Sequence, residues 1–302
     1  MKKTILFVSA LAMLTFSSCS QEEDTVQENN IVLQQESAAD LTRQLKAYDS
    51  QFALRKAPML SGSDKKKNLN WLDWLKVGVA DVKGGISGYK EGGWAGAAWG
   101  AAVASLEKYL EIYSAKNMEK NNKIECSGSL IAANDDSHTF NDSIGYYHNM
   151  AEEMLYSKYG NAASGRNINN LLIETNTYLN GLSLGYRITH KPTAQSRLLL
   201  MNRLTKLRNI PDDTDVDFFD YCEKVKAKEL ADSSYIDFAA EYLYTCVCAN
   251  VGDVREYTKN VLRQIDGSNA ASRTKGILSS SVLIGFSSLM YSSQIECTEI
   301  KQ

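Results

Sequence analysis

The stretch that decides the fold reads ADVKGGISGYKEGGWAGAAWGAAVA and runs from Ala80 to Ala104. Five of its glycines are spaced four residues apart, at Gly84, Gly88, Gly92, Gly96 and Gly100. Residues four apart stack on one face of a helix. The spacing therefore predicts a groove without side chains, into which the backbone of a second helix can pack unusually closely.

This glycine row needs a partner surface. Each glycine inside a helix costs roughly 0.8–1 kcal/mol relative to alanine, so the seven glycines from Gly84 to Gly100 cost about 5–7 kcal/mol. A helix tolerates that cost only where close packing offsets it. We predict an intramolecular helical hairpin with arms at Trp71–Lys90 and Trp94–Tyr113 and a turn near Gly92–Gly93. Self-association of two copies and membrane insertion are the alternatives.

Charged residues weigh against the membrane alternative. Lys90 and Glu91 lie inside the glycine row, and the uncharged stretch that follows extends only from Gly92 to Leu106. A membrane span needs about 20 consecutive apolar residues. Tryptophans suit membrane interfaces, but they would equally cover the flank of a glycine groove; all four lie in or beside this segment, at Trp71, Trp74, Trp94 and Trp99.

The N-terminus has the features of an export signal. Met1-Lys2-Lys3 is positively charged, Thr4–Phe16 is apolar, and Ser17-Ser18-Cys19 places small residues before a cysteine. Residues 1–18 resemble a bacterial lipoprotein signal peptide, cleaved before Cys19, which then carries the lipid. Phe16 stands where leucine is usual in such signals. We therefore expect a protein anchored in the membrane through its N-terminal lipid.

The residues after Cys19 predict where the anchored protein is located. Residues 20–24 read SQEED, which resembles the acidic run of surface-exported lipoproteins of the Bacteroidetes. We expect a bacterial cell-envelope location at the outer membrane, with exposure at the cell surface. Residues 19–35 are polar and are predicted to form a flexible tether.

Composition bounds the classes of partner. Removing residues 1–18 takes away two lysines and no acid, so 33 basic and 36 acidic residues become 31 and 36, a net charge of −5. Nucleic-acid binding requires clustered positive charge, so we expect no nucleic-acid partner. We also expect no cofactor. The chain has only three prolines, which suits long helices.

Five cysteines remain apart from Cys19: Cys126, Cys222, Cys246, Cys248 and Cys297. An exported location permits disulfides, and an odd number leaves at least one thiol free. Cys246 and Cys248 are two residues apart on a predicted helix, so they should point to different sides. Metal ligation would favour a wider spacing such as CxxC. We expect buried, inert cysteines and no metal site.

The remainder of the chain is predicted to be helical, which makes the fold class all-α: a glycine-rich helical hairpin joined to a multi-helix bundle. Residues 36–114 would hold an N-terminal helix and the hairpin, and residues 140–302 a C-terminal helical bundle. The polar segment Ala115–Thr139 is predicted to be a long loop and a domain boundary. The last helix, Ala270–Tyr291, carries few charges on any side and should run through the centre of the bundle.

The strongest candidate for chemistry is the segment IGYYHN, residues 144–149. His148 and Glu152 are one helical turn apart, so they could form a ligand site or an acid–base pair. The simpler interpretation, which we favour, is a buried histidine hydrogen-bonded to a neighbour. The Gly-x-x-His-Asn element resembles one in uncharacterised envelope lipoproteins of the Bacteroidetes, which also combine a lipoprotein signal, a glycine-rich segment and a helical remainder. That resemblance implies no activity.

Two other motifs are weaker. Ser183 lies in GLSLG, which matches G-x-S-x-G in letters, but a nucleophile elbow needs a preceding strand and Ser183 falls late in a predicted helix. Residues 212–217 read DDTDVD, with carboxylates at calcium-like spacing but without the glycine and glutamate of an EF-hand loop. We interpret the acidic run as a helix cap.

These observations favour a lipid-anchored envelope lipoprotein with a non-enzymatic structural or interaction role. The alternative is a membrane-active protein, pore-forming or bacteriocin-like, that acts through the glycine row. A third hypothesis is an enzyme or metal site around His148. Self-association through Gly84–Gly100 stays open, because the sequence does not say which surface the row contacts.

Overall fold

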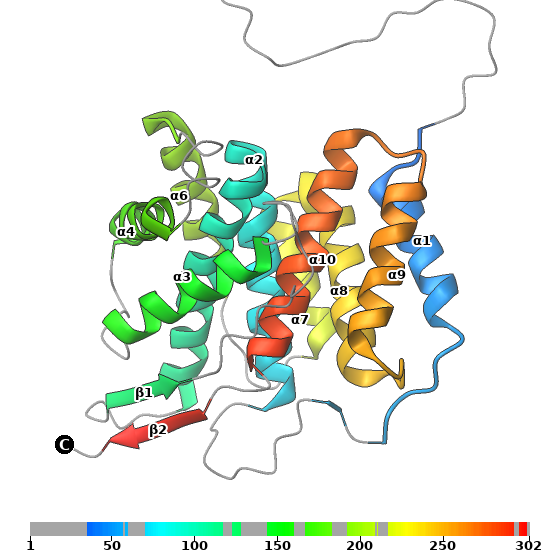
Figure 1. Cartoon of the computed structure of the whole chain (residues 1–302), viewed down its shortest axis with the longest axis horizontal. Helices are drawn as coiled ribbons and strands as arrows, with labels where there is room; N and C mark the ends of the chain where they lie inside the picture. The colour runs from blue at the N-terminus through cyan, green and yellow to red at the C-terminus, as the bar shows by residue number, and fades with distance from the viewer. Residues whose placement is uncertain are drawn as a thin grey trace, which may run out of the picture. The chain divides into compact units, whose positions relative to one another are not determined.

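Helices make up almost all the regular structure of the chain (Figure 1). A computed structural model describes residues 35–56, 58–59, 70–116, 123–127, 144–159, 167–182, 192–208, 210, 217–292 and 296–300. The helices are α1 (Ala38–Asp49), α2 (Trp71–Lys116), α3 (Ile144–Tyr159), α4 (Ile168–Leu182), α6 (Ala194–Arg208), α7 (Phe218–Lys228), α8 (Ser233–Cys248), α9 (Val254–Gly267) and α10 (Ser272–Ser292), with a 3₁₀ turn, η2, at Leu230–Asp232. The predicted all-α bundle is confirmed.

The predicted hairpin is present within α2. Helical geometry breaks at Gly92, with φ −157° and ψ 20°, and at Gly93, with φ 59° and ψ −148°. The positive φ of Gly93 lies in the region that favours glycine. The arms on either side of this turn run antiparallel, because Gly84 faces Gly100 and Gly88 faces Gly96.

The glycine row lets the two arms touch through their backbones. A Cβ atom built at Gly88 would lie 1.8 Å from the carbonyl oxygen of Gly96, and one built at Gly100 would lie 2.3 Å from that of Gly84. Gly85, next to this row, faces α10, since a Cβ there would lie 2.7 Å from the Cδ1 atom of Ile284. The missing side chains therefore admit two neighbours: the other arm and α10.

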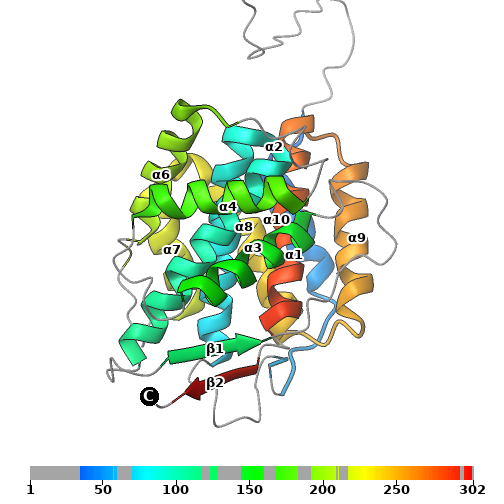
Figure 2. The same cartoon turned by 60° about the vertical axis from the view of Figure 1, so that its left-hand side comes forward.

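The hairpin lies at the centre of the bundle (Figures 1 and 2). It contacts α3, α4, α6, α7, α8 and α10, while α1 packs on α8 and α9 packs on α10. One hydrophobic core joins all these helices, and residues 35–302 form one compact unit. The hairpin and the C-terminal helices thus share a core, which corrects the predicted division into separate parts at 36–114 and 140–302. The central position predicted for the last helix is observed, because α10 packs extensively on α2.

The tryptophans seal the flanks of the hairpin. Trp74 and Trp99 are buried, and Trp71 and Trp94 are partly buried against the core. The indole N–H of Trp99 donates to the carbonyl oxygen of Leu172 on α4 at 2.6 Å. These residues serve the interior of the bundle. Among the described residues, no helix combines the length and the apolar character that crossing a membrane requires.

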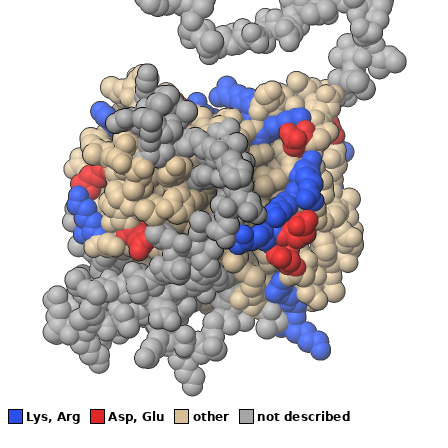
Figure 3. Space-filling model, in the orientation of Figure 1, with Lys and Arg blue, Asp and Glu red and all other residues tan. Residues whose placement is uncertain are grey.

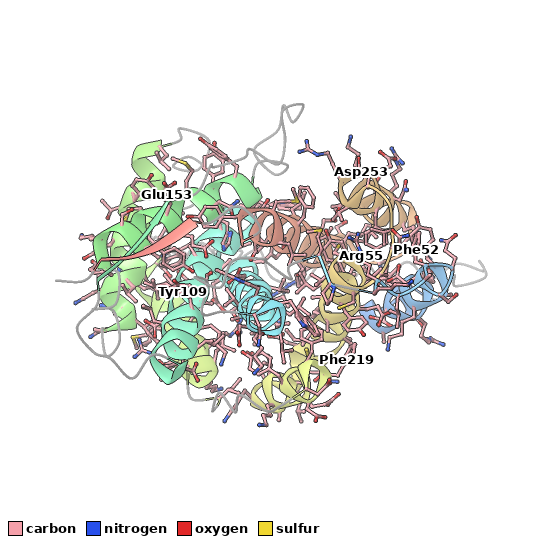
Figure 4. All side chains as sticks on the ribbon, turned by 90° about the horizontal axis from the view of Figure 1, so that it is seen from below. Phe52, Arg55, Tyr109, Glu153, Phe219 and Asp253 are labelled. Atoms are coloured by element: carbon pink, nitrogen blue, oxygen red, sulfur yellow. The ribbon has the colours of Figure 1, made fainter. Side chains whose placement is uncertain are left out.

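The segment from α1 to Met59 wraps the other side of the bundle. Phe52 packs edge-on against the ring of Tyr257, with ring centroids 5.8 Å apart, and the guanidinium of Arg55 donates to the carbonyl oxygen of Ala249 (Figure 4). Both Tyr257 and Thr245 donate hydrogen bonds to the buried carboxylate of Asp49. These contacts fasten α1 to α8 and α9.

Two short strands depart from the sequence prediction. β1 (Lys123–Ser127) pairs antiparallel with β2 (Glu296–Ile300), and β1 lies inside the segment predicted as a long loop. Each strand has five residues, too few for alternation to stand out in a sequence. The partners are also far apart in the chain, so no local pattern announces the pairing.

Candidate functional site

Three ionisable side chains meet in the core where α2, α3 and α10 pack together. The Nε2 atom of His148 lies 3.8 Å from the Oδ2 atom of Asp81 and 3.8 Å from the Oε2 atom of Glu152. Asp81 and His148 are fully buried, and Glu152 is 2% exposed. We call Asp81, His148 and Glu152 the acid–histidine cluster. The sequence predicted two of its members and missed Asp81.

Helix α3 delivers the two predicted residues. His148 and Glu152 are four apart and so share one face. This face reaches α10 because Gly145 carries no side chain: a Cβ there would lie 1.9 Å from the hydroxyl oxygen of Ser287. The amide nitrogen of Asn149 donates to the carbonyl oxygen of Ser287 at 3.1 Å. The Gly-x-x-His-Asn element thus has a physical role: the glycine and asparagine dock α3 on α10, and the histidine enters the core.

Hydroxyl groups hold the two carboxylates. Asp81 accepts a hydrogen bond from Ser288 on α10 through Oδ2. Glu152 accepts two through Oε1, from Ser105 on the second arm of the hairpin at 2.6 Å and from Tyr156 at 2.7 Å. Each carboxylate is therefore bonded to a helix other than its own, and the cluster links α2, α3 and α10.

The hydrogen bonds assign the proton on the imidazole of His148. Its Nδ1 atom lies 2.9 Å from the Oδ1 atom of Asn149. Because the amide nitrogen of Asn149 donates to α10, its oxygen is left to accept a bond from the histidine. The Nδ1 atom then carries the proton, and Nε2 presents a lone pair toward the two carboxylates.

Burial shifts the protonation equilibria within the cluster. The loss of solvent raises the pKa of Asp81 well above its ordinary value, and the nearby Glu152 carboxylate adds to this rise. Burial also lowers the pKa of His148, against the opposing influence of Glu152. Burial therefore favours the neutral forms of both the Asp81 carboxyl and the His148 imidazole.

Three atoms of the cluster have no hydrogen-bond partner within the described part of the chain: Asp81 Oδ1, His148 Nε2 and Glu152 Oε2. These are acid–base groups, but burial closes them to a substrate in this conformation. Among the residues that the structure describes, no set of His, Cys, Asp and Glu side chains is arranged to hold a metal ion. The geometry therefore supports a role in joining three helices and retaining a proton.

A second polar cluster anchors the hairpin tip. Lys83 contacts Glu229 at 2.8 Å and also pairs with Asp232, and Lys90 pairs with the same aspartate. Asp232 is fully buried, and the two lysines hold its pKa below the ordinary value despite that burial. Nearby, Arg203 on α6 contacts Glu91 at 3.3 Å. The charges that interrupt the glycine row are thus paired with the bundle.

The other predicted residues fall into two groups. Cys19 and Ser183 lie outside the described residues, as does most of the acidic run before α7. The last residue of that run, Asp217, accepts a hydrogen bond from the backbone N–H of Phe219 at 2.9 Å and so caps α7. The capping interpretation holds for this residue.

The three helical cysteines, Cys222, Cys246 and Cys248, are free and buried. Burial raises the pKa of the Cys248 thiol to about 11 and also raises those of Cys222 and Cys246. Thiolates are the reactive form, so these thiols are poor nucleophiles at neutral pH.

Comparison with known proteins adds no further constraint on the site. No known protein family, curated protein or solved structure matches this chain. The resemblance to envelope lipoproteins of the Bacteroidetes therefore stays a prediction.

Proposed function

We propose that this protein is a lipid-anchored cell-envelope lipoprotein with a non-enzymatic structural or interaction role, in which the glycine hairpin is the internal framework. The observation that carries the proposal is the backbone contact between the two arms. Gly84, Gly88, Gly96 and Gly100 are all buried, and each would place a Cβ within 2.4 Å of a backbone atom of the opposite arm. The glycine row of each arm is thus covered by the other arm of the same chain.

The paired charges support the same interpretation. Lys83, Lys90 and Glu91 contact acidic or basic residues of α6 and of the α7–α8 junction. Moving the hairpin into a bilayer would break these ion pairs and leave charges in a medium where they are costly. The alternative, a pore-forming or bacteriocin-like protein, requires the bundle to open first.

The surface supports an interaction role. Four large apolar side chains are 38–46% exposed on α4 and α6, two helices that pack against each other: Ile173, Leu182, Leu198 and Leu199. The face seen in Figure 3 carries Lys and Arg side chains beside Asp and Glu side chains on its left-hand as well as its right-hand side. We infer that a partner with apolar side chains would contact Leu198 and Leu199, the adjacent exposed pair on α6.

A labelling experiment tests the anchor. Cells expressing the full chain are fed an alkyne-bearing fatty acid, and the protein is recovered from the membrane fraction. We expect the wild type to carry the label and Cys19→Ser to lose it, while Cys222→Ser serves as the matched control and keeps it. An unlabelled wild type would contradict the lipoprotein half of the proposal.

Dye release from lipid vesicles tests the framework role. The mature chain carrying Cys19→Ser, which is folded but lacks the lipid, is added to dye-loaded vesicles of anionic and zwitterionic lipids. We expect no release, with a pore-forming peptide as the positive control. Release by the folded chain would favour the membrane-active alternative instead.

A photo-crosslinking experiment tests the interaction half. A photoreactive residue replaces the exposed Leu198 on α6, and a matched control replaces the exposed Gln195 one turn earlier on the same helix. We expect one discrete adduct at position 198 in intact cells and none at 195. Equal adducts at both positions, or none at either, would argue for a purely structural role.

A further inference from the structure

The two strands place a pair of cysteines opposite each other. In the register of β1 and β2, Cys126 is the partner of Cys297, with Glu125 opposite Thr298 and Ser127 opposite Glu296. The strands lie side by side at one end of the bundle in both views (Figures 1 and 2). The cysteines come from distant parts of the chain, 171 positions apart (297 minus 126). The pairing therefore joins two segments that share no local connection.

The spacing of an antiparallel ladder suits a disulfide at this position. Directly opposed residues have Cα atoms about 5.5 Å apart in a hydrogen-bonded pair and about 4.5 Å apart in a non-hydrogen-bonded pair. Disulfides span Cα separations of roughly 4.4–6.8 Å. The Cα spacing of both kinds of pair falls inside that range, and the shorter Cβ separation of a non-hydrogen-bonded pair suits a disulfide better. A register shift of one residue would remove the opposition.

The remaining cysteines leave this pair as the one the fold favours. Cys222, Cys246 and Cys248 are free and buried in helices. Of the five cysteines apart from Cys19, the strand pair uses two and leaves these three. The odd number seen in the sequence is then accounted for.

A covalent link would also stabilise the two-stranded ribbon that β1 and β2 form. An isolated two-stranded ribbon is only marginally stable in water. β2 follows α10, and β1 precedes α3 and contacts it. A bond between the strands would therefore tie the segment that follows α10 to the segment that connects α2 with α3.

We propose that Cys126 and Cys297 form a cross-strand disulfide in the exported protein. One cysteine thiolate attacks the disulfide of an oxidant, which forms a mixed disulfide and releases one thiol of the oxidant. The second cysteine thiolate then displaces the oxidant's other sulfur, so the oxidant leaves as a dithiol with two electrons and two protons. The oxidant is a protein or small-molecule disulfide. Only its supply in the cell rests on the proposed envelope location.

Thiol counting tests the proposal without relying on export. The Cys19→Ser chain is purified, equilibrated with oxidised and reduced glutathione, denatured without reductant and alkylated. We expect three alkylated cysteines before reduction and five after it, and a peptide map that joins residues 126 and 297. Five alkylated cysteines before reduction, or a link through a helical cysteine, would overturn the proposal. Loss of fatty-acid labelling on the wild type would reject the lipoprotein assignment and leave this result standing.

A thermal measurement separates the disulfide from nonspecific effects of the reductant. Reduction should lower the Tm of the wild type by about 5–15 °C, the range expected for a native disulfide in a domain of this size. Cys126→Ser/Cys297→Ser should melt at the temperature of the reduced wild type and should not respond to reductant. Cys222→Ser is the matched control and should keep the full response. An unchanged Tm of the wild type on reduction would contradict a stabilising bond.

Discussion

Substituting a single glycine at the contact between the hairpin arms distinguishes tertiary packing from helix propensity. The two effects predict changes of opposite sign in the free energy of unfolding. An alanine Cβ at position 88 would lie 1.8 Å from the carbonyl oxygen of Gly96 and 2.6 Å from its carbonyl carbon. Ordinary contact begins at 3.4 Å, so the arms would have to separate by about 1.6 Å (3.4 minus 1.8). Both contacting atoms belong to the backbone, so no side-chain rotation relieves the overlap.

The magnitudes decide the sign of the change. Replacing glycine by alanine in a helix interior stabilises by about 1 kcal/mol through propensity. Overpacking costs about 1–3 kcal/mol, and more where the backbone has to move. Because both contacting atoms are backbone, we take the upper end of the overpacking range for Gly88→Ala, so the net loss in the free energy of unfolding is about 2 kcal/mol (3 minus 1), which lowers Tm by roughly 4–8 °C.

The chain supplies a matched control. Gly181 lies near the end of α4, and a Cβ there would meet nothing within 4 Å. Gly181→Ala should therefore keep the propensity term alone and stabilise by up to about 1 kcal/mol. Urea unfolding followed by circular dichroism at 222 nm measures both variants. If Gly88→Ala proved as stable as Gly181→Ala, the close contact between the arms would be refuted.

Three further predictions concern buried carboxylates. Burial raises the pKa of Asp81, so the stability that its proton confers is present at low pH and is lost as pH rises through the raised pKa. Asp81→Asn should abolish this loss of stability, measured as the urea midpoint at each pH. Parallel pH profiles of the two chains would refute the prediction. Burial raises the pKa of Asp49 from 3.8 to about 6. The free energy of unfolding of the wild type should therefore fall between pH 4 and 6, by up to about 3 kcal/mol relative to Asp49→Asn. A difference between the two chains that stays constant with pH would count against this. Asp232→Asn removes the charge that the buried Lys83 and the partly buried Lys90 share, and it should cost about 3–5 kcal/mol. Glu256→Gln, at an exposed ion pair, should change stability by about 0.5 kcal/mol or less, and equal effects of the two substitutions would contradict the distinction.

The candidate site was only partly readable in the sequence. His148 and Glu152 stood out because they are one turn apart on a single helix, and that relation is local. Asp81 is 67 positions before His148 (148 minus 81) and reaches it only because the hairpin packs under α3. One signal pointed to it: the residues three and four positions away on either side of Asp81 are all small or apolar, namely Val77, Gly78, Gly84 and Gly85.

The strand pairing and the domain division also depend on contacts between distant segments, which the sequence does not reveal. Five-residue strands carry too little alternation to be recognised, and β1 finds its partner at the far end of the chain. The polar segment after α2 was a reasonable place for a domain boundary. Whether the flanking segments share a core, however, depends on which apolar faces meet, and a one-dimensional pattern does not specify that.

The sequence by itself determined the helical class of the fold and predicted the hairpin, because the spacing of residues along a helix sets which side chains share a face. The tertiary structure alone decided that the glycine row packs against its own chain, that Gly85 receives α10, that Asp81 joins the cluster and that Cys126 pairs with Cys297 in the strand register. These are contacts between segments distant in the chain, and they arise from the packing of whole helices around one core.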